Sequence, residues 1–182
     1  YDVDFEQKSN VTIDEYLMMI RLKTSVLLAT ALQIGAYIAG ASEEEQEAVY
    51  QFGINIGLAF QIQDDILDVW GDPKTFGKAV GGDIACNKKT FVYLEAIRRL
   101  GDEGMRRLGE ELEDWYNQML DDNKEKIVRV KEIFEQLGVR EACERVVRDY
   151  TQRALDILET LPQNEASEEL RKLAEKLLVR RV

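Results

Sequence analysis

The sequence predicts an all-α protein, a bundle of helices. Hydrophobic residues recur with a helical period of about 3.6 along almost the whole chain. Helix-capping patterns precede the first two long segments, and only 2 of the 182 residues are proline. Short β-branched runs disfavour an all-β sandwich or barrel. Hydrophobic residues make up 45% of the chain, which is enough for a sizeable core.

Start and stop signals predict the first two helices. Thr12–Glu15 and Ser42–Glu45 both fit the S/T-x-x-E capping box, in which side chains bond the free N–H groups of a helix start. The first helix is expected over 13–38, ending at Gly40, and the second over 43–69. Residues 71–87 contain four glycines and one proline. They are predicted to form one long loop, which in a compact domain is usually functional or mobile.

Helical periodicity then resumes and continues to the end of the chain. Helices are expected near 88–100, 103–120, 124–137, 139–161 and 167–180, with breaks at Gly101, Asp121-Asp122, Gly138 and Pro162. The length favours one domain, and no repeat or second domain is evident.

Glycine spacing predicts close helix packing. Gly53 and Gly57 form a G-x-x-x-G pattern on the second helix, which lets another helix approach closely. Gly35 and Gly40 are expected to serve the same purpose on the first helix.

Residues 24–42 carry no charge, which is the length at which a membrane span becomes a candidate. The stretch contains polar residues, and it lacks flanking aromatic or basic clusters. A helix buried on most sides of a helical domain, and no membrane span, is therefore expected.

The composition excludes several functions. The chain has no histidine, which excludes Ser-His-Asp triads and His–zinc sites within it. The net charge of -11 disfavours nucleic acid as a partner. Cys86 and Cys143 lie far apart without metal-ligand spacing, so free thiols in a reducing cytoplasm are expected.

The richest chemical pattern is an acidic stretch of the second helix. At 100° per residue, Gln61, Asp64 and Asp68 fall on one face, with Asp65 at its edge. Apolar residues surround these carboxylates, which predicts that they point into a lined cavity and bind a cation. Hard oxygen ligands favour Mg²⁺, or Mn²⁺. The alternative is an acidic helix end exposed to water.

Basic residues occur near the acidic ones along the chain. Lys23-Thr24 precedes the uncharged stretch, Lys78 lies in the glycine-rich segment, and Lys88-Lys89 follows it. Together with carboxylates and magnesium, these groups suit a polyphosphate ligand. For Lys23, an ammonium that merely reaches the solvent from a buried helix remains an alternative. Nucleotide-binding glycine motifs are absent from the sequence.

These motifs resemble a known family. Phe60–Val69, Gly71–Pro73, Gly77-Lys78, Gly82–Ile84 and Asn87–Thr90 are similar to the second aspartate-rich region of the trans-isoprenyl diphosphate synthases, or polyprenyl synthetases. The short-chain members include geranyl, farnesyl and geranylgeranyl diphosphate synthases. Tyr16–Thr24 resembles the lysine–threonine segment of the same family.

The resemblance implies a helical isoprenoid-synthase fold around a central apolar cavity, usually in a homodimer. It implies condensation of an allylic diphosphate with isopentenyl diphosphate, after Mg²⁺-assisted ionisation of the allylic substrate. Asp64 would bind magnesium directly, and Asp65 and Asp68 directly or through water. The resemblance implies contacts to the diphosphate for Lys23, Thr24, Gln61, Lys78 and Lys88. It also implies that Lys23, Gln61 and Asp64 are the catalytic groups.

The family also has a first aspartate-rich motif on an earlier helix, and the sequence lacks it. Residues 1–182 therefore resemble the C-terminal part of a single polyprenyl synthetase domain, with the N-terminal helices missing, and this part alone is expected to be inactive. Two alternatives remain: a related terpene or squalene-type synthase, and a non-catalytic helical partner subunit.

Overall fold

The computed structural model describes residues 11–72, 80–103 and 105–179. These residues form helices, with no strand among them, so the all-α prediction is confirmed. They divide into two compact units, the first with residues 11–16 and 64–144 and the second with 17–63 and 145–179. Three helices contribute residues to both units: α2 (Ile13–Ile20), α4 (Glu43–Trp70) and α10 (Val139–Glu159).

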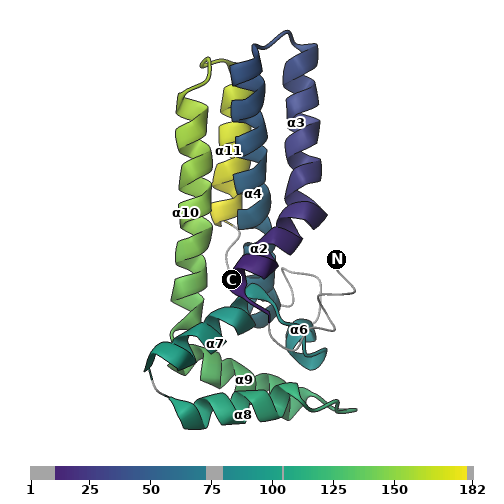
Figure 1. Cartoon of the computed structure of the whole chain (residues 1–182), viewed down its shortest axis with the longest axis vertical. Helices are drawn as coiled ribbons and strands as arrows, with labels where there is room; N and C mark the ends of the chain where they lie inside the picture. Colours follow the sequence, from purple (N-terminus) through teal and green to yellow (C-terminus); the bar gives the residue numbers. More distant parts are fainter. Residues whose placement is uncertain (1–10, 73–79, 104, 180–182) are drawn as a thin grey trace. The chain divides into compact units, whose positions relative to one another are not determined.

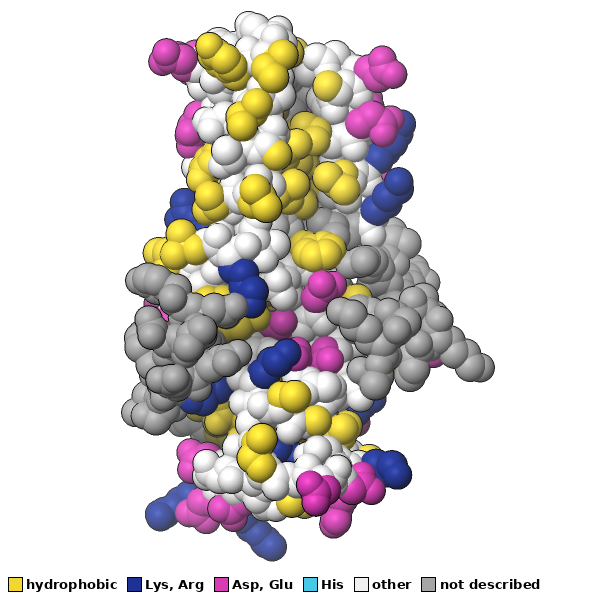
Figure 2. All heavy atoms as spheres, turned by 90° about the vertical axis from the view of Figure 1, so that its right-hand side faces the viewer, with side chains coloured by type: hydrophobic (Ala, Val, Ile, Leu, Met, Phe, Trp, Pro, Cys, Tyr) yellow, Lys and Arg dark blue, Asp and Glu magenta, His cyan; other side chains and the backbone are white. Residues whose placement is uncertain are grey.

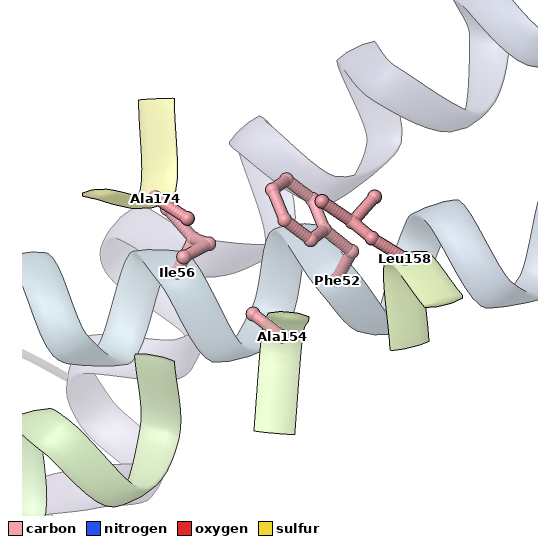
Figure 3. Close-up of a cluster of buried hydrophobic side chains, with 5 residues drawn as sticks. All are labelled: Phe52, Ile56, Ala154, Leu158 and Ala174. Atoms are coloured by element: carbon pink, nitrogen blue, oxygen red, sulfur yellow. The ribbon is translucent and has the colours of Figure 1, made fainter. Parts of the chain in front are cut away.

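The second unit is built around the first part of α4. Figure 1 shows α3 (Val26–Ile38), α10 and α11 (Glu165–Val179) running alongside this helix. The core between them is a cluster of buried side chains from α4, α10 and α11, drawn in Figure 3: Phe52, Ile56, Ala154, Leu158 and Ala174. Burial of these apolar side chains fixes the first part of α4, which carries Gln61.

Two glycines of α4 allow α3 and the segment before it to approach closely. A Cβ atom at Gly53 would lie 2.5 Å from Ala29 Cα, and one at Gly57 would lie 2.6 Å from Ser25 Cα. The predicted role of these two glycines in close helix packing is confirmed. The same prediction is wrong for Gly35 and Gly40, which have no neighbour among the described residues within 4 Å of an added Cβ. Gly40 instead ends the helix region, in a left-handed conformation with a φ of 78°.

The outer face of α3 corrects the prediction of a helix buried on most sides. Leu28 and Leu32 pack against the core cluster, whereas Leu27 is 76% exposed and Ile38 is 78% exposed. Figure 2 shows hydrophobic side chains gathered over this helix. The described residues cover only one side of α3. Ile13–Ile38 is the one described helical stretch long and apolar enough to cross a membrane, which is weak evidence taken alone.

Among its described residues, the first unit contains four further helices: α6 (Gly82–Ala85), α7 (Phe91–Glu103), α8 (Arg106–Tyr116) and α9 (Lys124–Gln136). Helix α9 packs against both α6 and α8, and α8 packs against α7. The predicted break at Gly101 is wrong, because α7 continues through this exposed glycine. One glycine costs a helix only about 1 kcal/mol, which packing of α7 offsets. The short helix α6 lies where a continuous loop was expected.

Candidate functional site

The acidic pattern lies on the last three turns of α4. Asp64 and Asp68 are half-buried and stand four residues apart in the helix, so they share a face with Gln61. The structure therefore presents two carboxylates one turn apart on a helix that is otherwise largely buried. Two such groups repel each other unless a cation or a proton screens them.

Asp65 has a different environment from its neighbours. It is only 4% exposed, and its Oδ2 accepts hydrogen bonds from the Tyr16 hydroxyl at 2.5 Å and from the Phe91 backbone N–H at 3.0 Å. Phe91 is the first residue of α7, so this carboxylate satisfies a free N–H of a helix start. Asp65 thus joins α2, α4 and α7. Burial and the Asp65 charge together raise the pKa of Tyr16 well above its ordinary value.

This structural role bears on the metal-binding role predicted for Asp65. One of its oxygens already accepts two hydrogen bonds, which leaves Asp64 and Asp68 as the more accessible carboxylates of the pattern. Direct ligation by Asp65 stays a prediction. The role of Tyr16 was missed from the sequence, because 49 residues separate it from its partner.

Asp68 connects α4 to the short helix α6. Its Oδ2 accepts a hydrogen bond from the Asp83 backbone N–H at 3.0 Å, and its own carbonyl accepts one from the Gly81 N–H at 2.6 Å. Burial raises the pKa of the Asp68 carboxyl above its ordinary value, and the Asp83 N–H partly opposes that shift. Asp68 is thus a partly desolvated carboxylate, which a cation would stabilise.

Lys88 contacts Asp83, the residue that bonds Asp68. Its ammonium forms an ion pair with Asp83 Oδ1 at 2.7 Å, and its backbone N–H donates to the Asp83 carbonyl at 2.9 Å. The hydrogen bond to Asp83 raises the pKa of Lys88. The structure therefore places the predicted diphosphate-binding Lys88 next to the residue that bonds Asp68. Lys78 lies outside the described residues.

The remaining predicted site residues belong to the second unit. Lys23 and Thr24 lie in a five-residue π-helix, η1 (Arg21–Ser25), between α2 and α3. The Thr24 hydroxyl donates a hydrogen bond to Gln61 Oε1 at 3.3 Å, so the structure brings these two predicted residues together. Lys23 is exposed. Its convergence with Asp64 and Asp68, which lie in the other unit, stays a prediction. Periodicity did not reveal η1, although short π-segments often mark functional sites.

The carboxylates of α4 are hard oxygen donors, which suit magnesium. Within the described residues, no group of three or more acidic or cysteine side chains stands close enough to enclose a metal ion. Mg²⁺ does not need such a cage, since it is usually held by one or two carboxylates together with water and substrate phosphate. The Asp64 and Asp68 carboxylates fit that mode of binding.

Comparison with known proteins gives the family. The polyprenyl synthetase profile matches residues 1–137. A short chain isoprenyl diphosphate synthase of Methanothermobacter thermautotrophicus is 38% identical over 180 residues, which cover 98% of this chain and 53% of that protein.

Solved structures agree with the sequence comparison. A geranylgeranyl pyrophosphate synthase structure matches with a TM-score of 0.88 and 45% identity, covering 100% of this chain and 55% of the other. A geranylgeranyl pyrophosphate synthase from Corynebacterium glutamicum, complexed with isoprenyl diphosphate and magnesium, matches with a TM-score of 0.87 and 29% identity, covering 98% and 50%. The chain spans about half the length of these relatives. It belongs to the polyprenyl synthetase family.

Proposed function

We propose that the protein is a prenyltransferase that condenses an allylic diphosphate with isopentenyl diphosphate. The observation that carries this proposal is the chain of contacts in the first unit. The Asp68 carboxylate bonds the Asp83 N–H, and the Asp83 carboxylate in turn holds the Lys88 ammonium. Carboxylates that can hold a divalent cation and an ammonium beside them are the groups that a diphosphate requires. Family membership supports the same activity.

The reaction breaks the allylic C–O bond and releases diphosphate. The resulting allylic cation alkylates the double bond of isopentenyl diphosphate, and loss of a proton completes the longer allylic product. In this proposal Lys23, Lys78 and Lys88 contact the diphosphate with their ammonium groups, and Thr24 and Gln61 contact it with polar side chains. Such preorganised groups stabilise the charge that develops on the leaving diphosphate.

Asp64 and Asp68 are the residues proposed to hold magnesium, with Asp65 supporting them from its buried position. Magnesium, or manganese, would supply positive charge to the diphosphate and so ease its departure. Because the chain has a net charge of -11, a diphosphate should bind poorly without such a cation.

The proposal extends to the state of the whole protein. We expect a homodimer, as the family resemblance implies, and a location in the cytoplasm, as the two cysteines suggest. Cys86 and Cys143 are both free thiols, in keeping with a reducing compartment.

The test measures incorporation of radiolabelled isopentenyl diphosphate into longer prenyl diphosphates by the full-length protein. Turnover is expected with an allylic diphosphate and Mg²⁺, and it should stop when a chelator is added. Asp64→Ala should lower turnover by orders of magnitude, because the lost interaction acts on the departing diphosphate. Asp121→Ala is the matched control, since Asp121 is exposed between α8 and α9.

The same assay separates the alternatives. A non-catalytic partner subunit would show no incorporation with any allylic diphosphate until a second protein is added. A terpene or squalene-type synthase would consume the allylic diphosphate without incorporating isopentenyl diphosphate. Either result would refute the proposed condensation.

A further inference from the structure

Lys126 is an unusual residue in the first unit, because its side chain is fully buried. It lies in the first turn of α9, and its exposed fraction is 0%. Lysines are almost never fully buried unless their ammonium has partners. Burial also lowers the pKa of Lys126, so an apolar side chain would fill the same space at a smaller cost. Space filling alone therefore does not account for an ammonium group at this position.

The partners of Lys126 form a closed network with one turn of the chain. The Lys126 ammonium donates hydrogen bonds to Asn87 Oδ1 and to the Gln118 carbonyl, the latter at 3.1 Å. Asn87 Nδ2 donates to the same Gln118 carbonyl at 3.0 Å. The Lys126 ammonium also lies 5.8 Å from the ring centre of Tyr116, which stacks on Tyr93 at 4.1 Å. Every polar group of the Asn87 side chain is thus bonded.

Asn87 occupies a backbone conformation that needs such support. Its φ is 55°, and it is the one non-glycine residue with a positive φ among the described residues. Left-handed geometry costs a non-glycine residue about 1 kcal/mol, although asparagine tolerates it better than most. The residue that follows is Lys88, so the conformation of Asn87 sets the direction in which the chain enters Lys88.

The same turn of α9 also holds the other end of α6. Gly81, with a φ of 87°, precedes α6, and an added Cβ there would lie 2.6 Å from the Ile127 side chain. Lys126 and Ile127 therefore contact the two left-handed residues on either side of α6. Between these contacts lies Asp83, which bonds both Asp68 and Lys88.

We propose that Lys126 is a positioning residue, which holds Asn87 and thereby fixes Lys88 for contact with a diphosphate. This inference rests on the proposed function of Lys88. Lys126 itself touches no proposed ligand of the metal and makes no proposed contact with substrate.

The test compares two substitutions in one turn of α9. Lys126→Met keeps the length of the side chain but removes its hydrogen bonds. Lys124→Met is the matched control, because Lys124 is 89% exposed and only approaches Asp122 at 3.6 Å. Binding of inorganic diphosphate with Mg²⁺ to the full-length protein is measured by titration calorimetry. Lys126→Met should weaken binding about tenfold, the value of one hydrogen bond to a charged group, whereas Lys124→Met should leave it within about twofold.

A double-substitution cycle shows whether Lys126 acts through Lys88. If it does, Lys126→Met should cause no further loss of binding in a Lys88→Met background. Losses that multiply, or wild-type binding by a folded Lys126→Met protein, would overturn the proposal. If Lys126→Met does not fold, Asn87→Gly replaces it in the same cycle, since glycine adopts the positive φ without strain but lacks the side-chain bonds.

Hydrogen exchange at the Lys88 amide separates this inference from the proposed function. That N–H bonds the Asp83 carbonyl, so its exchange reports the order of the turn without any substrate. If Lys88→Met leaves diphosphate binding unchanged, the proposed function of Lys88 fails. Faster exchange in Lys126→Met, but not in Lys124→Met, would still support the positioning of the turn by Lys126. Unchanged exchange in both would refute it.

Discussion

At the scale of one residue, the carboxyl of Asp68, which is proposed to hold magnesium, lowers the stability of the fold. Burial raises the pKa of its carboxyl, so the folded protein binds a proton at this site more tightly than the unfolded chain does. The charged form is thus disfavoured in the fold. This unfavourable contribution is fully present above the raised pKa, and it disappears as the pH falls below the ordinary value of 3.8.

We therefore predict that Asp68→Asn raises the midpoint of thermal unfolding at about pH 7, and that the gain shrinks as the pH falls toward about 4. The asparagine oxygen can still accept the bond from the Asp83 N–H. Calorimetric melts across this pH range check the prediction. Mg²⁺-dependent diphosphate binding should weaken in the same variant, whereas Asp121→Asn should change neither property. Destabilisation of Asp68→Asn at neutral pH would contradict this account.

The sequence predicted part of this chemistry at the residue scale. Helical spacing was enough to place Gln61, Asp64 and Asp68 on one face of α4. It could not show that Asp65 bonds Tyr16 and Phe91, because these partners are 49 and 26 residues away and only tertiary packing brings them together. The sequence did not predict the network around Lys126 for the same reason, because Asn87 is 39 residues away from Lys126 along the chain.

At the scale of elements, the contact between η1 and α4 depends on a missing side chain. An added Cβ at Gly57 would lie 2.6 Å from Ser25 Cα, which is backbone and cannot rotate away. Gly57→Ala should therefore lower the free energy of unfolding by about 2 kcal/mol or more, as overpacking does in cores. Urea unfolding of the two proteins measures the difference.

Gly35→Ala provides the control for this prediction. Gly35 is also helical, in α3, but in the described part of the chain nothing lies within 4 Å of an added Cβ. Alanine should stabilise the helix there by about 0.5–1 kcal/mol. The two substitutions are chemically identical and should have opposite signs. Equal effects would mean that close approach is not what Gly57 provides.

Glu95 supports a second prediction about elements. Burial by itself would raise its pKa, but hydrogen bonds from Arg98 and Arg99 outweigh burial and lower it. Arg99 also donates to the Leu137 carbonyl at 2.8 Å, just after α9, so Glu95 helps to join α7 to α9. Because the folded pKa is depressed, this stabilisation is complete above the ordinary pKa of 4.5 and is lost as the pH falls through the lowered value.

Glu95→Gln should thus lower the free energy of unfolding by about 2 kcal/mol near neutral pH, with a smaller difference in acid. Glu110→Gln is the comparison, since Glu110 forms an exposed pair with Arg106 and should contribute less than about 0.5 kcal/mol. Denaturant melts at two pH values give both numbers. A Glu95→Gln penalty that does not shrink in acid would argue against the ion pair as its cause.

The elements also show where sequence signals were sufficient. Both predicted capping boxes form, with the Thr12 and Ser42 side chains bonding the N–H groups of Glu15 and Glu45. Caps are local, so they can be found in the sequence. The π-helix that holds Lys23 and the helix through Gly101 depend on packing, and no local pattern predicts them.

At the scale of the whole molecule, the exposed face of α3 bears on the expected inactivity of this chain. Its large apolar side chains lie open to solvent in the described residues: Leu27, Ile34, Tyr37 and Ile38. Contiguous exposed apolar surface usually marks an interaction site. The chain spans about half the length of its relatives, and its sequence contains D-D-x-x-D once, at 64–68. The central apolar cavity and the single-domain organisation stay predictions.

We predict that the 182-residue chain alone is inactive and binds a hydrophobic dye more strongly than the full-length protein does. With one aspartate-rich helix, a single weakly held magnesium would offset little of the repulsion between the carboxylates and a diphosphate. Uncovered apolar walls would also admit water, which captures the allylic cation before it can alkylate isopentenyl diphosphate. Incorporation of labelled isopentenyl diphosphate is measured for both lengths of chain, with Mg²⁺ and with a chelator. The longer chain should turn over only with Mg²⁺, and the shorter chain under neither condition. Robust turnover by the 182 residues would show that Asp64 and Asp68 suffice to hold the metal, and that no second acidic helix is needed.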